Sequence, residues 1–414
     1  MTKEKVIPQI RFSGFTDTWE QHKLGEFADI VGGGTPSTSN FEYWDGDIDW
    51  YAPAEIADQI FVSSSERKIT QQGYDNSSAK MLPVGTVLFT SRAGIGKTAI
   101  LRKEGCTNQG FQSIVPHINE LDSYFIFSRS EEMKRYGETV GAGSTFVEVS
   151  GKQMANMELM MPTTMEEQVT IGSFFRNLDS IITLHQRKYD KLTKVKKAML
   201  EKMFPKNGSS VPEIRFKGFT DAWEQRKLSD MVERVTRKNE NRESELPLTI
   251  SAQYGLIDQN EFFDKRIASR DVSGYYLLKK GEFAYNKSTS SDAPWGAVKR
   301  LDRYEMGVLS TLYIVFALKE NGNIDSDFLV SYYDTDCWHK GVQAIAAEGA
   351  RNHGLLNITP ADYFETVLTV PSDVKEQHQI GSFFAKLDTL ITLHQRKLEK
   401  LKNIKKACLE KMFV

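Results

Sequence analysis

The chain contains the same two segments twice, and this duplication restricts its possible folds more than any other feature does. Residues 10–24, IRFSGFTDTWEQHKL, recur at 214–228 as IRFKGFTDAWEQRKL, with about twelve of fifteen positions identical at an offset of 204. Residues 167–204 recur at 376–413 at an offset of 209, with roughly two thirds of the positions identical. The stretches between these copies match only faintly. The sequence therefore predicts one duplicated frame that carries two divergent inserts.

The longer repeat predicts a long helix in each half of the chain, at 166–205 and 375–414. Neither copy is interrupted by proline within the repeat, and apolar residues recur at alternating steps of three and four. At ~1.5 Å per residue each helix could extend ~55 Å, which is more than the core of one insert requires. We therefore expect the helices to pair as an antiparallel coiled coil. The expected pairing residues are Ile171, Phe174, Leu178, Ile181, Leu192, Val195, Met199, Ile380, Phe383, Leu387, Leu390, Leu401 and Ile404.

Gly, Ser and Pro residues after the first helix predict a linker at 206–213. The linker separates a first domain at 1–165 and its helix from a second domain at 214–374 and its helix. Because the second opening segment follows the first helix directly, a pseudo-twofold arrangement would place the first opening segment beside the end of the second helix. We therefore expect the two chain termini to lie close together.

The composition is that of an ordinary soluble protein and gives no support to membrane, disulfide or metal chemistry. The 414 residues carry a net charge of −2, and no run approaches the ~18 apolar residues of a membrane span. The N-terminus lacks the apolar core of a signal peptide, so we expect a cytoplasmic protein. Cys106, Cys337 and Cys408 lie far apart without C-x-x-C spacing, and the seven histidines show no metal-binding spacing. We expect neither disulfides nor a metal site.

Two stretches resemble enzyme motifs without completing them. SRAGIGKT at 91–98 approaches a phosphate-binding loop, but Ser91 stands where the first glycine belongs and a second predicted strand follows instead of a helix. DAPW at 292–295 approaches a methyltransferase motif, but no glycine-rich cofactor loop precedes it. We therefore expect no catalytic residues. A methyltransferase or ATPase that acts alone remains the alternative from the enzyme class.

The inserts are predicted to contain short strands joined by polar loops, and these loops hold side chains that can bind DNA. Residues 80–100 and 277–298 each indicate a strand, a polar loop and a returning strand. Donor-rich side chains in such loops bind base edges or phosphates, although an ordinary exposed loop residue remains an open interpretation for each one. The candidates are Arg92, Lys97, Asn108, Gln109, Ser144 and Thr145 in the first half and Asn286, Lys287, Ser288, Arg351, Asn352 and His353 in the second.

The C-terminal halves of both long helices are basic, at 187–206 and 396–411. Cationic side chains are favoured near a helix C-terminus, so a solvated face of the coiled coil is the preferred interpretation of these residues. Direct contact with nucleic acid is the alternative.

Several stretches of the chain occur in a characteristic order and spacing. They are both GFTD..WEQ openings, GGGTPSTSNFEYWDGDIDW at 32–50, LFTSRAGIGKTAI at 88–100, NQGFQSIVP at 108–116, GSTFVEVSG at 143–151, and both P…EQ…IGSFF…LD entries to the helices. Together they resemble the DNA specificity subunit of type I restriction–modification systems over essentially the whole chain. The resemblance implies an α+β fold with two similar mixed α/β target-recognition domains, separated by two long antiparallel helices in a pseudo-twofold internal repeat.

The resemblance also implies partners and a role. Each target-recognition domain would read one half of a split site in double-stranded DNA, and different loop tips would make the site asymmetric. The chain itself would bind no cofactor. It would recruit two methyltransferase subunits, which use S-adenosylmethionine, and two restriction subunits, which use ATP and Mg²⁺; no membrane is involved. The alternative from a third class is a coiled-coil scaffold whose two domains bind proteins.

Overall fold

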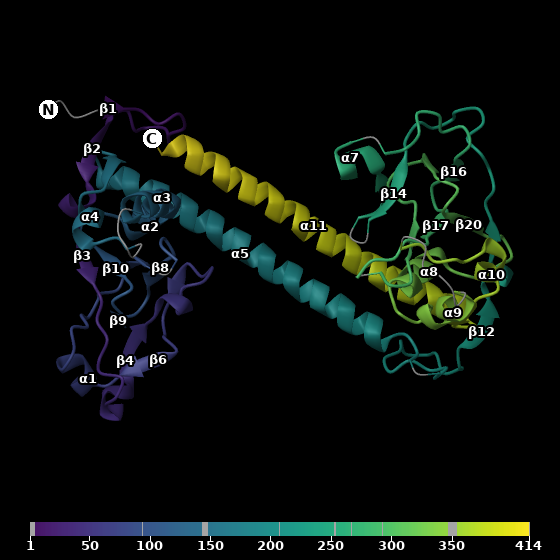
Figure 1. Cartoon of the computed structure of the whole chain (residues 1–414), viewed down its shortest axis with the longest axis horizontal. Helices are drawn as coiled ribbons and strands as arrows, with labels where there is room; N and C mark the ends of the chain where they lie inside the picture. Colours follow the sequence, from purple (N-terminus) through teal and green to yellow (C-terminus); the bar gives the residue numbers. More distant parts are fainter. Residues whose placement is uncertain are drawn as a thin grey trace. The chain divides into compact units, whose positions relative to one another are not determined.

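The computed structural model describes residues 5–92, 94–142, 148–206, 208–251, 254–265, 267–291, 293–346 and 354–413. The chain divides into two compact units, a first unit of residues 1–186 and 396–414 and a second unit of residues 187–395. The long helices α5 (Met165–Lys202) and α11 (Val374–Met412) are divided between the units. The N-terminal part of α5 and the C-terminal part of α11 belong to the first unit, and the other two parts belong to the second. Figure 1 shows these helices and the elements around them. We call the rest of each unit its head. Both helices lie close to the predicted ranges.

The described residues of the first head form three sheets. The largest has the order β3-β10-β7-β8-β5, and every residue of its central strand β7 is buried. Its strands are β3 (Ala28–Gly32), β5 (Phe61–Val62), β7 (Val87–Phe89), β8 (Thr98–Leu101) and β10 (Gln112–Pro116). The smaller sheets combine β6 (Arg67–Ile69), β4 (Trp44–Tyr51) and β9 (Cys106–Thr107), and β1 (Lys5–Val6), β2 (Trp19–Lys23) and β11 (Glu158–Met161).

Short helices connect these strands. They are η1 (Leu24–Glu26), η2 (Phe41–Tyr43), η3 (Pro53–Glu55), α1 (Gln71–Asp75), α2 (Ser123–Ser128), α3 (Ser130–Gly141) and α4 (Gly151–Ala155). The side chain of Asp122 fixes the start of α2, because its Oδ1 accepts a hydrogen bond from the backbone N–H of Phe125 at 2.7 Å.

The second head repeats the main sheet of the first with one strand fewer, in the order β13-β20-β17-β18. Its other strands form three antiparallel pairs, β12 with β21, β14 with β15 and β16 with β19. The strands are β12 (Glu224–Lys227), β13 (Val232–Arg234), β14 (Leu248–Ser251), β15 (Gly255–Asp258), β16 (Tyr276–Lys279), β17 (Phe283–Asn286), β18 (Ala297–Arg300), β19 (Met306–Leu309), β20 (Ile314–Leu318) and β21 (Val367–Val370). The helices are α6 (Leu228–Met231), α7 (Gln259–Phe263), α8 (Ser326–Tyr333), α9 (His339–Ile345) and α10 (Pro360–Phe364). The prediction of two similar mixed α/β heads is confirmed.

Side chains of the two repeated segments join each opening segment to its long helix. Nε and Nη2 of Arg11 donate to the carboxylate of Glu167 at 2.6 and 2.7 Å. Arg215 donates in the same way to Glu376, at the same two distances. Both glutamates are buried, at 1% exposed each. A bidentate guanidinium–carboxylate pair fixes orientation as well as distance, so the duplicated sequence forms the same structural joint twice.

Within each unit the two long helices are joined by equivalent ion pairs. In the first unit Lys405 of α11 lies 2.6 Å from Asp179 of α5. In the second unit Lys196 of α5 lies 2.7 Å from Asp388 of α11. Asp388 and Lys405 are the counterparts of Asp179 and Lys196 at the repeat offset of 209. Each pair joins the N-terminal half of one helix to the C-terminal half of the other, so the predicted antiparallel pairing is confirmed.

Most of the predicted pairing residues pack inside their units. Ile171, Leu178, Ile380 and Leu387 are buried, and Phe174, Leu192, Met199 and Phe383 pack against the buried clusters. Val195 and Leu401 are half-buried. The prediction is wrong for Ile181, Leu390 and Ile404, which are 44, 42 and 39% exposed.

The geometry of an undistorted helix explains the exposure of Ile181 and Leu390. At ~100° per residue, a side chain ten positions after Ile171 points ~80° away from it, and this is the place of Ile181. The same spacing separates Ile380 from Leu390. The buried face instead includes Phe175, Phe384 and Leu398, which are 0, 1 and 6% exposed and were absent from the prediction.

The last aromatic residue of each repeat completes a core. Phe413 stacks on Phe175 in the first unit, with ring centroids 5.8 Å apart. Its counterpart Phe204 lies 5.9 Å from Phe384 in the second unit. The cores therefore depend on residues from the far end of the partner helix.

The opening segment of each half is hydrogen bonded to the end of a long helix. The backbone N–H of Ile10 donates to the carbonyl of Lys411 at 3.0 Å, and that of Ile214 donates to Lys202 at 2.9 Å. The expectation that the first opening segment lies beside the end of the second helix is therefore confirmed within the first unit. Among the described residues, no helix combines the length and the apolar character needed to cross a bilayer.

Candidate nucleic-acid interface

The loops that follow β7 and β17 hold the same place in the two heads. In the first head the N–H of Val149 donates to the carbonyl of Ser91 at 3.0 Å, and in the second head the N–H of Leu356 donates to Lys287 at 3.0 Å. Isolated bridges then join Arg92 to Glu148 and Ser288 to Leu355. The frame therefore presents one loop per head at the same end of the main sheet, with different residues in it.

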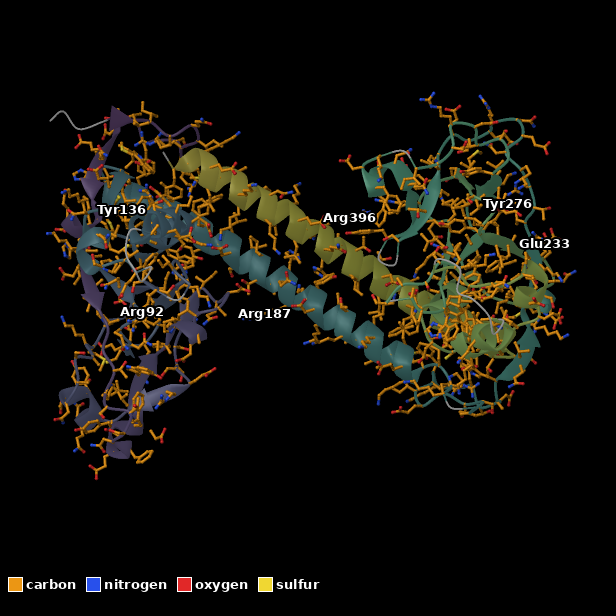
Figure 2. All side chains as sticks on the ribbon, in the orientation of Figure 1. Arg92, Tyr136, Arg187, Glu233, Tyr276 and Arg396 are labelled. Carbon is orange, nitrogen blue, oxygen red and sulfur yellow. The ribbon has the colours of Figure 1, made fainter. Side chains whose placement is uncertain are left out.

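A turn in the first head brings Arg92 close to two other candidates. The carbonyl of Gly110 accepts from the N–H of Ser91 at 2.8 Å, and Oδ1 of Asn108 accepts from the N–H of Gly110 at 2.8 Å. A Cβ at Gly110 would lie 2.8 Å from Pro53 and 3.6 Å from Nε of Arg92. Glycine allows the close approach to Pro53, and Arg92, labelled in Figure 2, lies in contact with the turn at 108–110, so these residues form one cluster.

The next residue of this turn extends the cluster to the loop after β3. The hydroxyl of Thr35 donates to Oε1 of Gln109. The sequence prediction did not include Thr35. The glycines before Thr35 could have indicated that this loop packs closely against other segments. A Cβ at Gly33 or Gly34 would lie 2.0 or 2.4 Å from a neighbouring backbone atom.

Lys97 lies apart from this cluster. It lines a separate cleft of about 550 Å³ together with Lys134 and Asp179. The loop that leads to it closes on Thr90, which accepts hydrogen bonds from the N–H groups of Gly96 and Lys97 at 3.0 and 2.9 Å. These amides are the donors that a phosphate-binding loop would need, so this loop is a closed hairpin turn and not a nucleotide site.

In the second head the candidates at 286–288 are partly used by their own loop. Oδ1 of Asn286 accepts from the N–H of Ser288 at 3.0 Å, and Nζ of Lys287 donates to the carbonyl of Ile358 at 3.4 Å. The loop is thereby fixed next to residue 354, where the described part of the chain resumes. The remaining candidates, Ser144, Thr145, Arg351, Asn352 and His353, lie outside the described residues.

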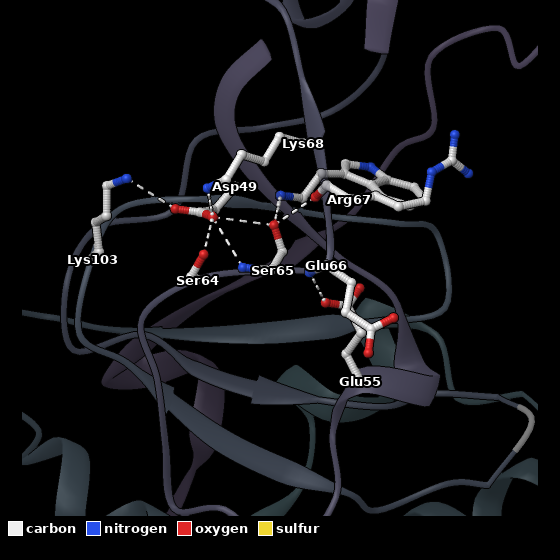
Figure 3. Close-up of polar contacts among 9 residues, drawn as sticks. Asp49, Glu55, Ser64, Ser65, Glu66, Arg67, Lys68 and Lys103 are labelled. Carbon is white, nitrogen blue, oxygen red and sulfur yellow. Dashed lines mark hydrogen bonds and ion pairs between the residues drawn. The ribbon is translucent and has the colours of Figure 1, made fainter. Parts of the chain in front are cut away.

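A buried carboxylate stabilises the part of the first head next to this interface (Figure 3). Asp49 accepts hydrogen bonds from the N–H of Ser65 and from Lys103, both at 3.0 Å, and from Lys68. Its side chain is fully buried, whereas those of Lys68 and Lys103 are 32 and 59% exposed. Burial alone would raise the pKa of this carboxyl, but the hydrogen bonds from Lys68, Ser65 and Lys103 outweigh burial and lower the pKa to about 2.

The strand that contains Asp49, β4, also positions the loop that contains Thr35. Asp49 and Trp50 are adjacent in β4, and Nε1 of Trp50 donates to the carbonyl of Gly34 at 2.8 Å. Nε1 of Trp44, at the start of the same strand, donates to Ser37 at 3.1 Å. The anchored strand therefore positions the loop after β3, and through it the hydrogen bond to Gln109.

The described residues contain no group of three or more His, Cys, Asp or Glu side chains arranged to hold a metal ion. The three cysteines are free thiols, and Cys106 is buried, which raises the pKa of its thiol to about 12. Loops with hydrogen-bond donors on a rigid sheet are suited to binding. We call the loops after β7 and β17 the reading loops, and Arg92, the turn at 108–110 and Thr35 the reading cluster.

Comparisons with known proteins agree with this arrangement. A family model described as the type I restriction modification DNA specificity domain matches residues 16–194. The chain is similar to the type I restriction enzyme MjaIX specificity subunit of Methanocaldococcus jannaschii, with 32% identity over 223 residues, or 52% of this chain and 51% of that protein. It is also similar to the EcoR124I/EcoR124II specificity subunit of Escherichia coli, with 29% identity over 189 residues, or 41% and 46% of the two chains.

The chain spans about half the length of the curated relatives it matches. A solved structure of a type I restriction–modification S subunit from M. genitalium shares the fold along the whole chain. Its TM-score is 0.63 at 12% sequence identity, and the match covers 99% of each chain. At this identity the likeness concerns the fold alone.

Proposed function

We propose that the chain is a type I restriction–modification specificity subunit, as its similarity to such subunits indicates, and that it binds double-stranded DNA and recognises a bipartite, asymmetric site. One observation carries this proposal. Both heads present a loop at the same position of the same frame, and the loops differ in sequence, with Ser91 and Arg92 in one and Lys287 and Ser288 in the other. Equal frames with different loops suit two half-sites of different sequence, separated by bases that are not read.

The proposed role is recognition without catalysis. The chain binds no cofactor in this account, and its partners are two methyltransferase subunits that use S-adenosylmethionine and two restriction subunits that use ATP and Mg²⁺. The long helices offer a surface that fits a partner bound twice. Ile181 and Leu184 are 44 and 50% exposed, and their counterparts Leu390 and Leu393 are 42 and 43% exposed. A repeated apolar surface favours two equal contacts.

Exchange of one head tests the bipartite proposal. Residues 25–160 would be replaced by the corresponding insert of another specificity subunit, and DNA methylated by the complex with its partner subunits would be sequenced for modified bases. We expect one half of the recognised sequence to change and the other half to remain. A site in which both halves change would contradict independent recognition by the two heads.

A preparation of the chain free of partner subunits tests the non-catalytic role. We expect no methyl transfer to DNA from radiolabelled S-adenosylmethionine and no hydrolysis of ATP. The matched control adds the methyltransferase subunits to the same preparation, which should restore methylation. Transfer by the chain alone would show that it is an enzyme.

A further inference from the structure

One cleft of the first unit contains two arginines that form no close ion pair with an acid among the described residues. Arg102, which follows β8, lies over the ring of Phe61 at 4.1 Å, and Arg176 of α5 lies 5.8 Å from the same ring. Both residues are exposed, and the cleft that they line measures about 300 Å³. Stacking on an aromatic ring fixes the plane of a guanidinium, while its N–H edge stays available for a carboxylate or a phosphate.

Among the described residues, the one acid that lines the same cleft can balance only one of the two arginines. Asp122 is the cap of α2, and its Oδ1 accepts from the N–H of Phe125 at 2.7 Å. Burial raises the pKa of this carboxyl, and the charge of Arg176 acts in the opposite direction, so Asp122 offsets one positive charge of the two. The cleft therefore keeps an excess of positive charge.

The corresponding strand of the second unit contains an arginine at a different position, and acids of the same unit bind its guanidinium group. Nε of Arg300, the last residue of β18, lies 2.6 Å from Asp302, and Nη2 lies 2.8 Å from Asp327. Nη1 also donates to the hydroxyl of Ser326 at 2.7 Å. All three guanidinium nitrogens are thus occupied within the chain.

The arginine pair of this cleft has no counterpart in the second unit. The carbonyl of Leu101 accepts from the N–H of Gly85 and that of Leu301 accepts from the N–H of Gly281, so Asp302 takes the place of Arg102. Asp327 is the second residue after the capping aspartate of α8, and the same position after the cap of α2 is Tyr124. At the repeat offset, the counterpart of Arg176 in α11 is Ala385. The second unit therefore lacks both arginines of the cleft, and only the first unit presents the pair.

An exposed apolar surface adjoins the arginine cleft. A second cleft of about 570 Å³ shares Val84, Gly85 and Ser123 with the first. Val84 is 62% exposed and Ile118, on its other side, is 88% exposed. A phosphate backbone would leave these side chains in water, whereas a protein segment with a carboxylate beside an apolar side chain would cover both.

The arginine cleft lies at the other end of the main sheet from the reading loops. β8 runs from the Lys97 loop to Arg102, and β10 runs from the turn at 108–110 to His117. A strand of this length separates its ends by ~13 Å at ~3.3 Å per residue. The position therefore favours a ligand other than the DNA bound by those loops.

We propose that Arg102 and Arg176 bind the carboxylate of a partner protein, in a segment that also places an apolar side chain against Val84 and Ile118. This partner binds once per chain, because the second unit has Asp302 and Ala385 at the positions of Arg102 and Arg176.

Binding of a defined peptide to the full chain tests the proposal. The probe is a fluorescein-labelled peptide of repeated Leu-Asp-Leu-Glu, compared with its amide analogue Leu-Asn-Leu-Gln by fluorescence anisotropy. We expect saturable binding of the acidic peptide with one site per chain, and at least a roughly tenfold loss of affinity in the Arg102→Ala/Arg176→Ala variant, because two charge-assisted contacts are removed. Arg187→Ala removes another exposed arginine of α5 and should bind as the wild type does.

A second variant guards against a folding defect. Arg102→Lys/Arg176→Lys keeps both charges but removes the bidentate fork, so we expect an intermediate loss of affinity with an unchanged thermal unfolding midpoint. No saturable binding of the acidic peptide, equal binding of the amide peptide, or unchanged binding in both variants would each overturn the proposal. Weaker duplex DNA binding in the alanine variant with a reduced salt dependence, and unaltered peptide affinity, would assign the arginines to phosphate and overturn it as well.

Discussion

At the scale of single residues, the stability of the first head depends on one buried carboxylate. Asp49→Asn keeps the size of the side chain but leaves Lys68 and Lys103 without a negative partner. Both lysines are exposed enough to turn towards water, so we expect a loss of about 2–3 kcal/mol in the free energy of unfolding, below the cost of a fully buried broken pair. Urea unfolding would measure this. Asp47→Asn, at an exposed position of the same strand, is the matched control and should change stability by less than about 0.5 kcal/mol.

The pH dependence of the same group has a defined sign. The pKa of Asp49 is about 2 in the folded chain against a usual 3.8, so its charge stabilises the fold above the usual pKa. This contribution, about 2 kcal/mol for such a shift, disappears as the pH falls from about 4 towards 2. The difference in unfolding free energy between wild type and Asp49→Asn should shrink over this range. A difference that stays constant with pH would contradict the assigned ionisation.

Arg92 is the side chain in the reading cluster for which the structure gives the sharpest expectation. If it binds a guanine edge, Arg92→Ala should cost about 1–3 kcal/mol in DNA binding and relax discrimination at one base position. A contact to phosphate would weaken all sequences evenly and lower the salt slope by about one unit. Titration of the assembled complex with cognate and single-base variant duplexes separates these outcomes, with Arg303→Ala, an exposed arginine after β18, as the control. Unchanged binding to every duplex would remove Arg92 from the interface.

At the scale of elements, the two copies of the helix ion pair have different surroundings. Asp179 is 6% exposed and has Lys405 and the hydroxyl of Tyr124 as partners, whereas Asp388 is 44% exposed. Lys196 also contacts Asp334, which retains Lys299 at 2.7 Å when Lys196 is removed. The same pair is therefore more sensitive to substitution in the first unit.

We expect Lys405→Ala to destabilise the chain by about 2 kcal/mol and its counterpart Lys196→Ala by about 1 kcal/mol, because only the first leaves a buried carboxylate without a cation. Thermal unfolding of both variants under the same conditions tests this order. A larger effect at Lys196 would mean that the buried carboxylate of Asp179 is satisfied without its lysine.

Some of these elements could be predicted from the sequence, and others could not. Duplication and apolar spacing were sufficient to predict both helices and their antiparallel pairing. The exposed positions of Ile181 and Leu390 were missed because a coiled-coil spacing was extended along an undistorted helix. The reading cluster could be predicted only in part, since Arg92 and Gln109 come from loops that polar residues identify. Thr35 and the separate position of Lys97 depend on packing between strands, which local sequence does not encode.

At the scale of the whole molecule, each half contains almost everything that the other half supplies. Residues 1–206 include Asp179 and Lys196, which would pair between two copies as Asp179 pairs with Lys405 in the full chain. Phe204 would take the place of Phe413 against Phe175. We therefore expect the truncated chain to dimerise and, with its partner subunits, to direct methylation to a palindromic form of one half-site.

Light scattering on residues 1–206 measures the first part of this expectation, and sequencing of methylated DNA measures the second. Asp179→Lys in the truncated chain should reduce dimerisation by placing like charges together, and Lys196→Asp in the same chain should restore it. A soluble monomer, or methylation at the original asymmetric site, would contradict the internal symmetry.

The joint between Arg11 and Glu167, repeated by Arg215 and Glu376, also bears on inheritance. Each head is bounded on both sides by sequence that occurs twice, and the contacts at its borders are the same in both copies. A crossover within these borders would exchange one head and leave every border contact intact, so the resulting chain would meet no new packing problem at its junctions. Recombination between genes could then exchange one whole head, and with it the recognised sequence, without the compensating mutations that a new fold would require.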